Sequence, residues 1–149
     1  MRVSQAWGRS LQFYYQLKGT NKMSKRILVI DDDSAIRKAF VLALEDIDCQ
    51  VDAAESGEAG IAMASNAEYD LIFLDLKMPG INGVETLIKL RDRGHKMPIY
   101  IVTAFNKEFT NQLRVAAEKG YDFEVMKKPI ESKDLVKITT AILQGAGEC

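Results

Sequence analysis

The stretch Arg26-Ile27-Leu28-Val29-Ile30-Asp31-Asp32-Asp33-Ser34 decides the fold of this 149-residue chain. Its apolar run has no polar interruption, which is typical of a strand buried on both faces of a parallel sheet. Apolar residues then recur at spacings of three and four from Ile36 to Ile47, which predicts an amphipathic helix capped by Asp33 or Ser34. The stretch is therefore the junction between a buried strand and a helix, the first step of a βα unit.

The same alternation continues to the end of the chain. Further strands are expected at 49–54, 71–74, 99–102 and 123–126, and further helices at 56–65, 84–93, 106–119 and 131–143. Glycine and proline occupy the connections between these segments, where they stop helices and strands. Five βα units with short connections predict one α/β domain at residues 24–145, a doubly wound parallel sheet with helices on both faces.

Composition excludes several classes of protein. The chain is 47% hydrophobic and 28% charged, which is typical of a folded globular protein. Residues 1–26 hold six basic and no acidic residues, so the remainder has a net charge of −7 and is a poor match for nucleic acid. No apolar run is long enough to span a membrane. Two cysteines and one histidine are too few for a zinc site and fit a reducing compartment, so we expect a cytoplasmic protein.

Residues 1–23 differ from the rest and are expected to form a poorly ordered N-terminal extension. They lack the apolar block of a secretory signal. Val3, Trp7, Leu11 and Tyr14 recur at helical spacing, so a docking or membrane-surface helix is the alternative to an unstructured start. At the other end, residues 146–149 are expected to be a flexible tail. Because so little chain follows residue 145, we expect the output to pass through another protein.

Polar side chains follow four of the five predicted strands. Asp31 and Asp32 follow the first strand, Asp75 the third, and Thr103 the fourth, and the fifth runs into Lys128. In open parallel sheets, ligands bind outside the carboxyl ends of the strands. Acids that converge there repel one another unless a cation lies among them, and oxygen ligands favour Mg²⁺. With a lysine and a hydroxyl added, the set suits a phosphoryl group, and Asp75 is the natural nucleophile.

The sequence resembles response-regulator receiver domains over residues 24–145. Four pieces carry the resemblance, in this order: Ile27-Leu28-Val29-Ile30-Asp31-Asp32, Asp75-Leu76-Lys77-Met78-Pro79 with Gly83, Thr103-Ala104, and Lys128-Pro129. Each piece alone is weak, but their combination at successive strand ends is specific. The resemblance implies a flavodoxin-like sheet with strand order 2-1-3-4-5 and five helices.

The resemblance also implies a function in two-component signal transduction. Asp75 would accept a phosphoryl group from a phosphohistidine on a sensor histidine kinase or a histidine phosphotransfer protein. The chain would then be a phosphorylatable signalling domain rather than an enzyme. Its changed state would be read by a downstream effector protein or passed on in a phosphorelay.

Roles for the other site residues follow from the same resemblance. Mg²⁺ would be bound by Asp31, through water, and by Asp32, Asp75 and the backbone carbonyl of Lys77. Thr103 and Lys128 would contact the phosphoryl oxygens. The Lys128-Pro129 bond is expected to be cis, and X–Pro bonds are where a cis peptide costs least.

Three points depart from the pattern or compete with it. The position that usually holds a switch aromatic is Val125, with Phe123 and Tyr121 just before it, and the sequence does not say which takes the role. A degenerate receiver that only binds proteins is one alternative. Another is a haloacid-dehalogenase-type phosphatase with Asp31 as nucleophile, although the acids beyond Lys128 include none at a strand end.

Overall fold

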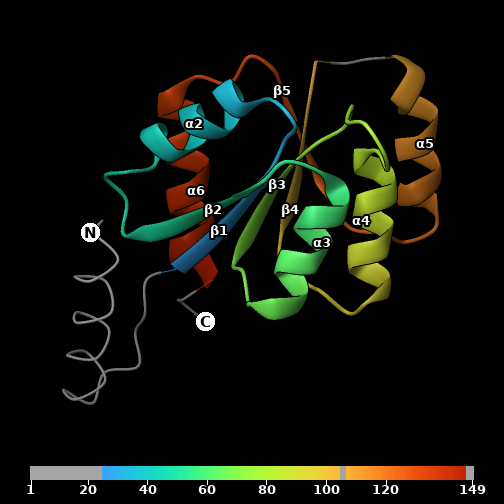
Figure 1. Cartoon of the computed structure of the whole chain (residues 1–149), viewed down its shortest axis with the longest axis horizontal. Coiled ribbons are helices and arrows are strands. Elements are labelled where there is room, and N and C mark those ends of the chain that lie inside the picture. Colours follow the sequence, from blue (N-terminus) through green and yellow to red (C-terminus); the bar gives the residue numbers. More distant parts are fainter. Residues whose placement is uncertain (1–24, 105–106, 147–149) are drawn as a thin grey trace.

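The computed structural model describes residues 25–104 and 107–146, and the expected N-terminal extension and residues 147–149 lie outside them. Five parallel strands form one sheet in the order β2-β1-β3-β4-β5 (Figure 1). The strands are β1 (Lys25–Ile30), β2 (Cys49–Ala54), β3 (Leu71–Asp75), β4 (Ile99–Thr103) and β5 (Glu124–Lys127). The expected α/β class and strand order are confirmed.

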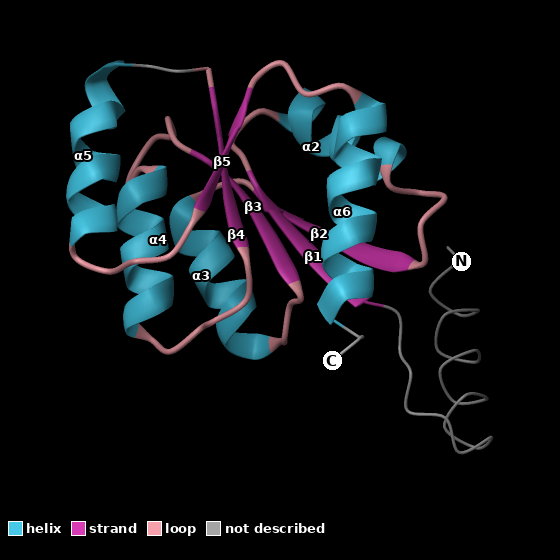
Figure 2. Cartoon of the chain, turned by 180° about the vertical axis from the view of Figure 1, so that it is seen from behind, coloured by secondary structure: helices cyan, strands magenta, loops and turns pink. Residues whose placement is uncertain are grey.

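Within the described part of the chain, five helices cover the two faces of the sheet (Figures 1 and 2). One face carries α2 (Ser34–Ala43) and α6 (Ser132–Ala146). The other carries α3 (Gly57–Asn66), α4 (Gly83–Asp92) and α5 (Lys107–Glu118). Among the described residues, no helix has the length and apolar character needed to cross a membrane.

The central strand β3 shows why its sequence is apolar throughout. All five of its residues are buried. Leu71 and Phe73 belong to the core under α2 and α6, whereas Ile72 and Leu74 belong to the core under α3, α4 and α5. Successive side chains of a strand point to opposite faces, so a strand covered on both sides needs apolar residues at every position.

Capping side chains fix where three helices begin. Asp33 accepts a hydrogen bond from the backbone N–H of Ala35, which selects Asp33 over Ser34 as the cap of α2. Ser56 caps α3 in the same way. Asn82 and Glu85 form a reciprocal capping box at the start of α4. Each cap satisfies backbone donors that the first turn of a helix leaves unpaired.

Most helix and strand ends lie within one residue of the expected ones, and the ends of α2 and α6 differ by more. α2 ends at Ala43, not Ile47, because the chain turns at Leu44, and the N–H of Ile47 bonds to the Leu44 carbonyl. Leu44 and Ile47 still pack on the core from this turn, which explains why the helical spacing continued past the helix. β5 begins one residue later than expected, and α6 runs three residues further, to Ala146.

Candidate functional site

Three carboxylates meet where β1 and β3 end. Ile30 pairs with Leu74 in the sheet, so the residues that follow them, Asp31 and Asp75, lie side by side. Asp31 is 3% exposed and Asp75 is 7% exposed, whereas Asp32 is exposed. One oxygen from each of the three acids lies within 4.8 Å of the others. The strand ends thus converge as the sequence predicts.

Lys128 completes the cluster from the end of β5, which is an edge strand of the sheet. Its Nζ donates a hydrogen bond of 2.8 Å to Oδ1 of Asp75 and lies 3.6 Å from Oδ2 of Asp31. The backbone N–H of Lys128 donates to the carbonyl of Thr103, which is itself buried at the end of β4. The Lys128-Pro129 peptide bond is cis, as expected. The preceding Lys127 is paired with Thr103 in the β4–β5 register and is exposed.

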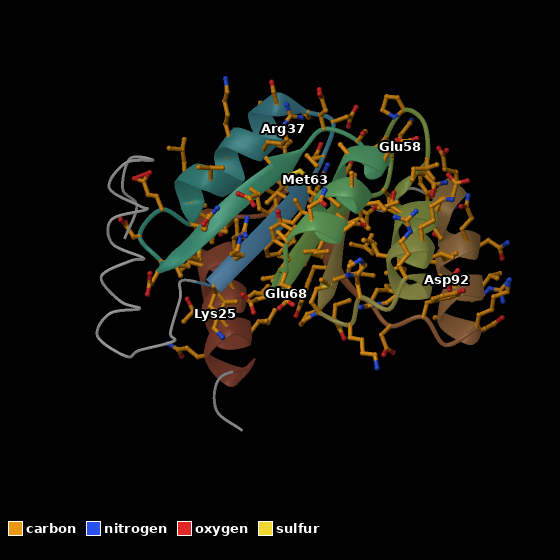
Figure 3. The ribbon with its side chains drawn as sticks, turned by 60° about the horizontal axis from the view of Figure 1, so that its bottom comes forward. Lys25, Arg37, Glu58, Met63, Glu68 and Asp92 are labelled. Atoms are coloured by element: carbon orange, nitrogen blue, oxygen red, sulfur yellow. The ribbon has the colours of Figure 1, made fainter. Side chains whose placement is uncertain are left out.

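Asp31 is held by two contacts that sequence reasoning did not identify. Its Oδ1 accepts a hydrogen bond from the N–H of Asp33, and its backbone carbonyl accepts one of 2.7 Å from Nη1 of Arg37. Arg37 lies on α2 near the strand ends in Figure 3, whereas Lys25 lies toward the opposite edge. In the sequence, the signal for this contact is Arg37 itself, a basic residue near the start of the helix that follows the acids. A basic residue at such a position has several explanations.

The loop after β3 is anchored by a glycine. The N–H of Gly83 donates to the carbonyl of Leu76, and a Cβ at position 83 would lie only 2.4 Å from the carbonyl oxygen of Asp75. Only a glycine allows α4 to begin this close to the end of β3. This contact positions the loop that includes Lys77. Lys77 lies two residues after Asp75 in the sequence, and its side chain is exposed.

The charges of the cluster perturb one another. Burial, together with the charges of nearby acids, raises the pKa of Asp75 above its ordinary value. Burial and the neighbouring acids also raise the pKa of Asp31, even though the Asp33 N–H and Lys128 act in the opposite direction. Burial acts to lower the pKa of Lys128, but its bonds and attraction to Asp75 and Asp31 raise it overall. The site therefore holds anionic charge at a cost that a bound cation would relieve.

These shifts predict how pH and Mg²⁺ affect stability. Each of these carboxyls has a higher pKa in the folded protein than its ordinary pKa of 3.8, so the folded state holds the proton more tightly. Its contribution to stability is therefore lost as the pH rises from 3.8 through the pKa of the folded state. Mg²⁺ needs the ionised carboxylates, so it should raise the melting temperature more at pH 7.5 than at pH 5. At a hundredfold excess over its dissociation constant, it should add about 2.7 kcal/mol.

Thermal melts with and without Mg²⁺ at both pH values check this prediction. Asp32→Asn should weaken the Mg²⁺-induced shift. Asp33→Asn is the matched control, because Asn keeps the helix cap and Asp33 is not among the clustered acids. Equal melting temperatures with and without Mg²⁺ at pH 7.5 would count against a cation site.

None of the candidate switch residues is an aromatic side chain on β5. Val125 lies on that strand and is 42% exposed. Phe123 packs against the core under α3, α4 and α5, and the hydroxyl of Tyr121 donates to Oδ1 of Asp92. Both aromatics precede β5 and are engaged elsewhere in the protein.

Comparisons with known proteins agree with this geometry. The family model described as "Response regulator receiver domain" matches residues 27–140, most of the chain. The chain belongs to the response-regulator receiver domain family. Membership favours the receiver hypothesis over the phosphatase alternative, and it makes the chain a receiver domain of two-component signalling.

Curated relatives carry the receiver domain in longer proteins. The transcriptional regulatory protein ResD of Bacillus subtilis is 36% identical over 123 residues, which cover 83% of this chain and 50% of that protein. The nitrate/nitrite response regulator protein NarL of Escherichia coli is 37% identical over 79% of this chain and 54% of that protein. The chain thus spans about half the length of the curated relatives it matches.

Solved structures show the same receiver fold. A CheY-like receiver domain protein from Methanospirillum hungatei aligns with a TM-score of 0.73 and 28% identity, covering 86% of this chain and all of that one. The response regulator TrrA of Thermotoga maritima, solved in complex with Mg²⁺-BeF, aligns with a TM-score of 0.67 and 29% identity. That match covers 79% of this chain and 98% of the TrrA chain.

Proposed function

We propose that Asp75 is the phosphoacceptor of this receiver domain. The observation that carries the proposal is the hydrogen bond from Lys128 Nζ to Asp75 Oδ1, beside two further carboxylates. Asp75 ends a buried strand, so its carboxylate is fixed in direction, and the ammonium lies where negative charge would develop during phosphoryl transfer. A carboxylate, a cation site and a fixed lysine are the parts that phosphoryl transfer uses for positioning and charge stabilisation.

The residues present fit a magnesium ion. Asp31, Asp32 and Asp75 supply hard oxygen ligands, and we assign a fourth, the backbone carbonyl of Lys77, from the family resemblance. Few carboxylates and several waters are the usual surroundings of Mg²⁺ in proteins. When bound, the ion would neutralise negative charge on the transferring phosphoryl group.

The protein's own groups would act on the donor as follows. A carboxylate oxygen of Asp75 forms a bond to phosphorus while the bond from phosphorus to the donor's imidazole nitrogen breaks. The electron pair of the broken bond stays on that imidazole. Lys128 then shifts from Asp75 to a phosphoryl oxygen, and the hydroxyl of Thr103 donates to another. The domain assists only this transfer and the later hydrolysis, so it is a signalling component and not an enzyme with turnover of its own.

The partners follow from this chemistry. The donor is a phosphohistidine on a sensor histidine kinase or a histidine phosphotransfer protein. We also propose the cytoplasm as the location of this protein. The readout is a downstream effector protein or a further relay step, and we propose residues 24–145 as the unit that carries it. A receiver that only binds proteins would not need the complete set of acids, hydroxyl and lysine, and the proximity of the acids and Lys128 supports the phosphoacceptor instead.

The direct test is phosphorylation with a small donor. We expect acetyl phosphate with Mg²⁺ to add one phosphoryl group per chain, read as intact mass, with acetate as the leaving group. Removing Mg²⁺ with a chelator should prevent the uptake, because the buried acids would then repel the incoming phosphate. No mass increase in the presence of Mg²⁺, on a chain shown to be folded by circular dichroism, would contradict the proposed function.

A further inference from the structure

Arg37 makes a defined contact with the backbone of the acidic cluster. It lies in the first turn of α2, where its own N–H donates to the carbonyl of Asp33, and Figure 3 shows it near the strand ends. Its Nη1 donates a hydrogen bond of 2.7 Å to the carbonyl of Asp31. The Arg37 side chain is half-buried, whereas that of the next residue, Lys38, is exposed. A bond from a charged, planar guanidinium is stronger and more directional than a neutral one.

The bond from Arg37 fixes the peptide unit that joins Asp31 to Asp32. The pairing of β1 with its neighbours ends at Ile30, and the N–H of Asp31 donates to the carbonyl of Ala54 at the end of β2. The peptide on the amino side of Asp31 is thus held by the sheet, and the peptide on its carboxyl side is held by Arg37. Because a peptide unit is planar, a fixed carbonyl also sets the direction in which the chain enters Asp32.

Asp32 needs this support more than Asp31 does. The Asp31 carboxylate is 3% exposed and accepts a hydrogen bond from the Asp33 N–H. Asp32 is exposed, yet one of its oxygens lies within 4.8 Å of an oxygen of Asp31 and of an oxygen of Asp75. The place of an exposed carboxylate in such a cluster depends on the backbone from which it projects, and Arg37 fixes the backbone at that point.

The charge of Arg37 works against a bound cation, so its effect through the backbone can be told apart from its charge. A guanidinium beside the acids repels Mg²⁺, and on charge alone its removal should tighten Mg²⁺ binding. Mg²⁺ demands nearly octahedral ligands at short distances, so it is sensitive to the direction of each carboxylate. Ca²⁺ accepts longer distances and more flexible geometry. Loss of the Arg37 contact should therefore weaken Mg²⁺ binding, and it should weaken Ca²⁺ binding less.

We propose that Arg37 is a positioning residue for the cation site and favours Mg²⁺ over Ca²⁺. It holds the peptide between Asp31 and Asp32 so that both carboxylates keep the directions that Mg²⁺ requires. Arg37 acts through this backbone and touches neither the cation nor the phosphoryl group. The inference rests on the proposed function, which assigns these acids to Mg²⁺. Residues that orient metal ligands typically change metal affinity about 10- to 100-fold when they are replaced.

Calorimetric titration of the full chain with Mg²⁺ alone at pH 7.5 tests this role without a phosphoryl donor. Arg37→Met keeps the apolar stem and removes the donor, and we expect its dissociation constant for Mg²⁺ to rise about tenfold. The dissociation constant for Ca²⁺, measured in the same way, should rise by about threefold or less, because Ca²⁺ tolerates displaced ligands. Circular dichroism shows whether the variant folds. Arg37→Gln, whose side chain is too short to reach the carbonyl, replaces it if it does not.

Lys38→Met is the matched control, since it removes the same charge from the adjacent, exposed position of α2. Its dissociation constant for Mg²⁺ should stay within about twofold of the wild-type value, as for other exposed charges. An equal loss of Mg²⁺ affinity in Lys38→Met and Arg37→Met would overturn the proposal, because the contact at position 37 would then not matter.

Two further outcomes would also overturn the positioning role. One is Mg²⁺ binding by Arg37→Met that is unchanged or tighter than in the wild type, which would leave only the repulsion between Arg37 and the cation. The other is an equal loss of Mg²⁺ and Ca²⁺ affinity, which would indicate a general disturbance of the site. These outcomes leave the proposed function standing. A wild-type chain that binds no Mg²⁺ would instead contradict the cation site, and with it both proposals.

Discussion

Asp75→Asn is expected to abolish phosphorylation by acetyl phosphate, whereas the wild-type chain gains one phosphoryl group. Asn has the shape of Asp but lacks the anionic oxygen that must bond to phosphorus. The neighbouring carboxylates cannot substitute. Asp31 is less exposed than Asp75, and its Oδ1 already accepts a hydrogen bond from the Asp33 N–H, whereas Asp32 is exposed and lacks the buried setting of Asp75. Intact mass after incubation with Mg²⁺ measures the result.

Two further variants show whether the loss is specific to position 75. Asp33→Asn keeps the cap of α2 and should take up phosphate at the wild-type rate. Asp31→Asn should slow uptake by weakening the cation site, but should not abolish it at high Mg²⁺. Full uptake by Asp75→Asn, or complete loss in Asp33→Asn, would be inconsistent with Asp75 as the acceptor.

Lys128→Met is expected to slow phosphorylation about a hundredfold, about 2.7 kcal/mol in the barrier. Met has a similar length and keeps the apolar stem, but it removes the ammonium that lies 2.8 Å from Asp75. In the wild type that charge can move to a phosphoryl oxygen while the transfer proceeds. The barrier rises because, among the described residues, Lys128 is the cationic side chain that bonds to Asp75.

The rate is measured from the growth of the phosphorylated mass at a fixed acetyl phosphate concentration. Lys127→Met is the matched control, since it removes the same charge from the adjacent, exposed position. We expect its rate to stay within about threefold of wild type, as for other exposed charges. Equal slowing in the two variants would show that the net charge of this region matters, and not the contact of Lys128.

The fold and most of the site were predictable because they depend on patterns that act locally. A buried parallel strand must be apolar at every position, and 71–74 is. The residue after such a strand must lie at the carboxyl edge of the sheet, so the sequence predicts Asp31 and Asp75 at the same edge. The strand order came instead from the family resemblance, since periodicity carries no information on which strands are neighbours.

Other features depend on the packed structure and left little trace in the sequence. The bond from Arg37 to the Asp31 carbonyl requires knowing where α2 lies relative to β1. The choice of Lys128 over Lys127 is set by how the chain leaves β5, and two adjacent lysines look alike in a sequence. The apolar spacing predicts that α2 continues to Ile47, which is four residues too far. Ile47 packs on the core from a turn, so its position in the sequence has the same spacing as a residue on a further turn of helix.

Mapping the phosphoryl group to a residue tests the central claim most directly. After incubation with acetyl phosphate and Mg²⁺, borohydride reduces an aspartyl phosphate to homoserine, which marks the acceptor position in a peptide mass spectrum. We predict homoserine at position 75 and unmodified Asp31, Asp32 and Asp33. Homoserine at position 31 would contradict the account and support the phosphatase alternative, in which Asp31 is the nucleophile.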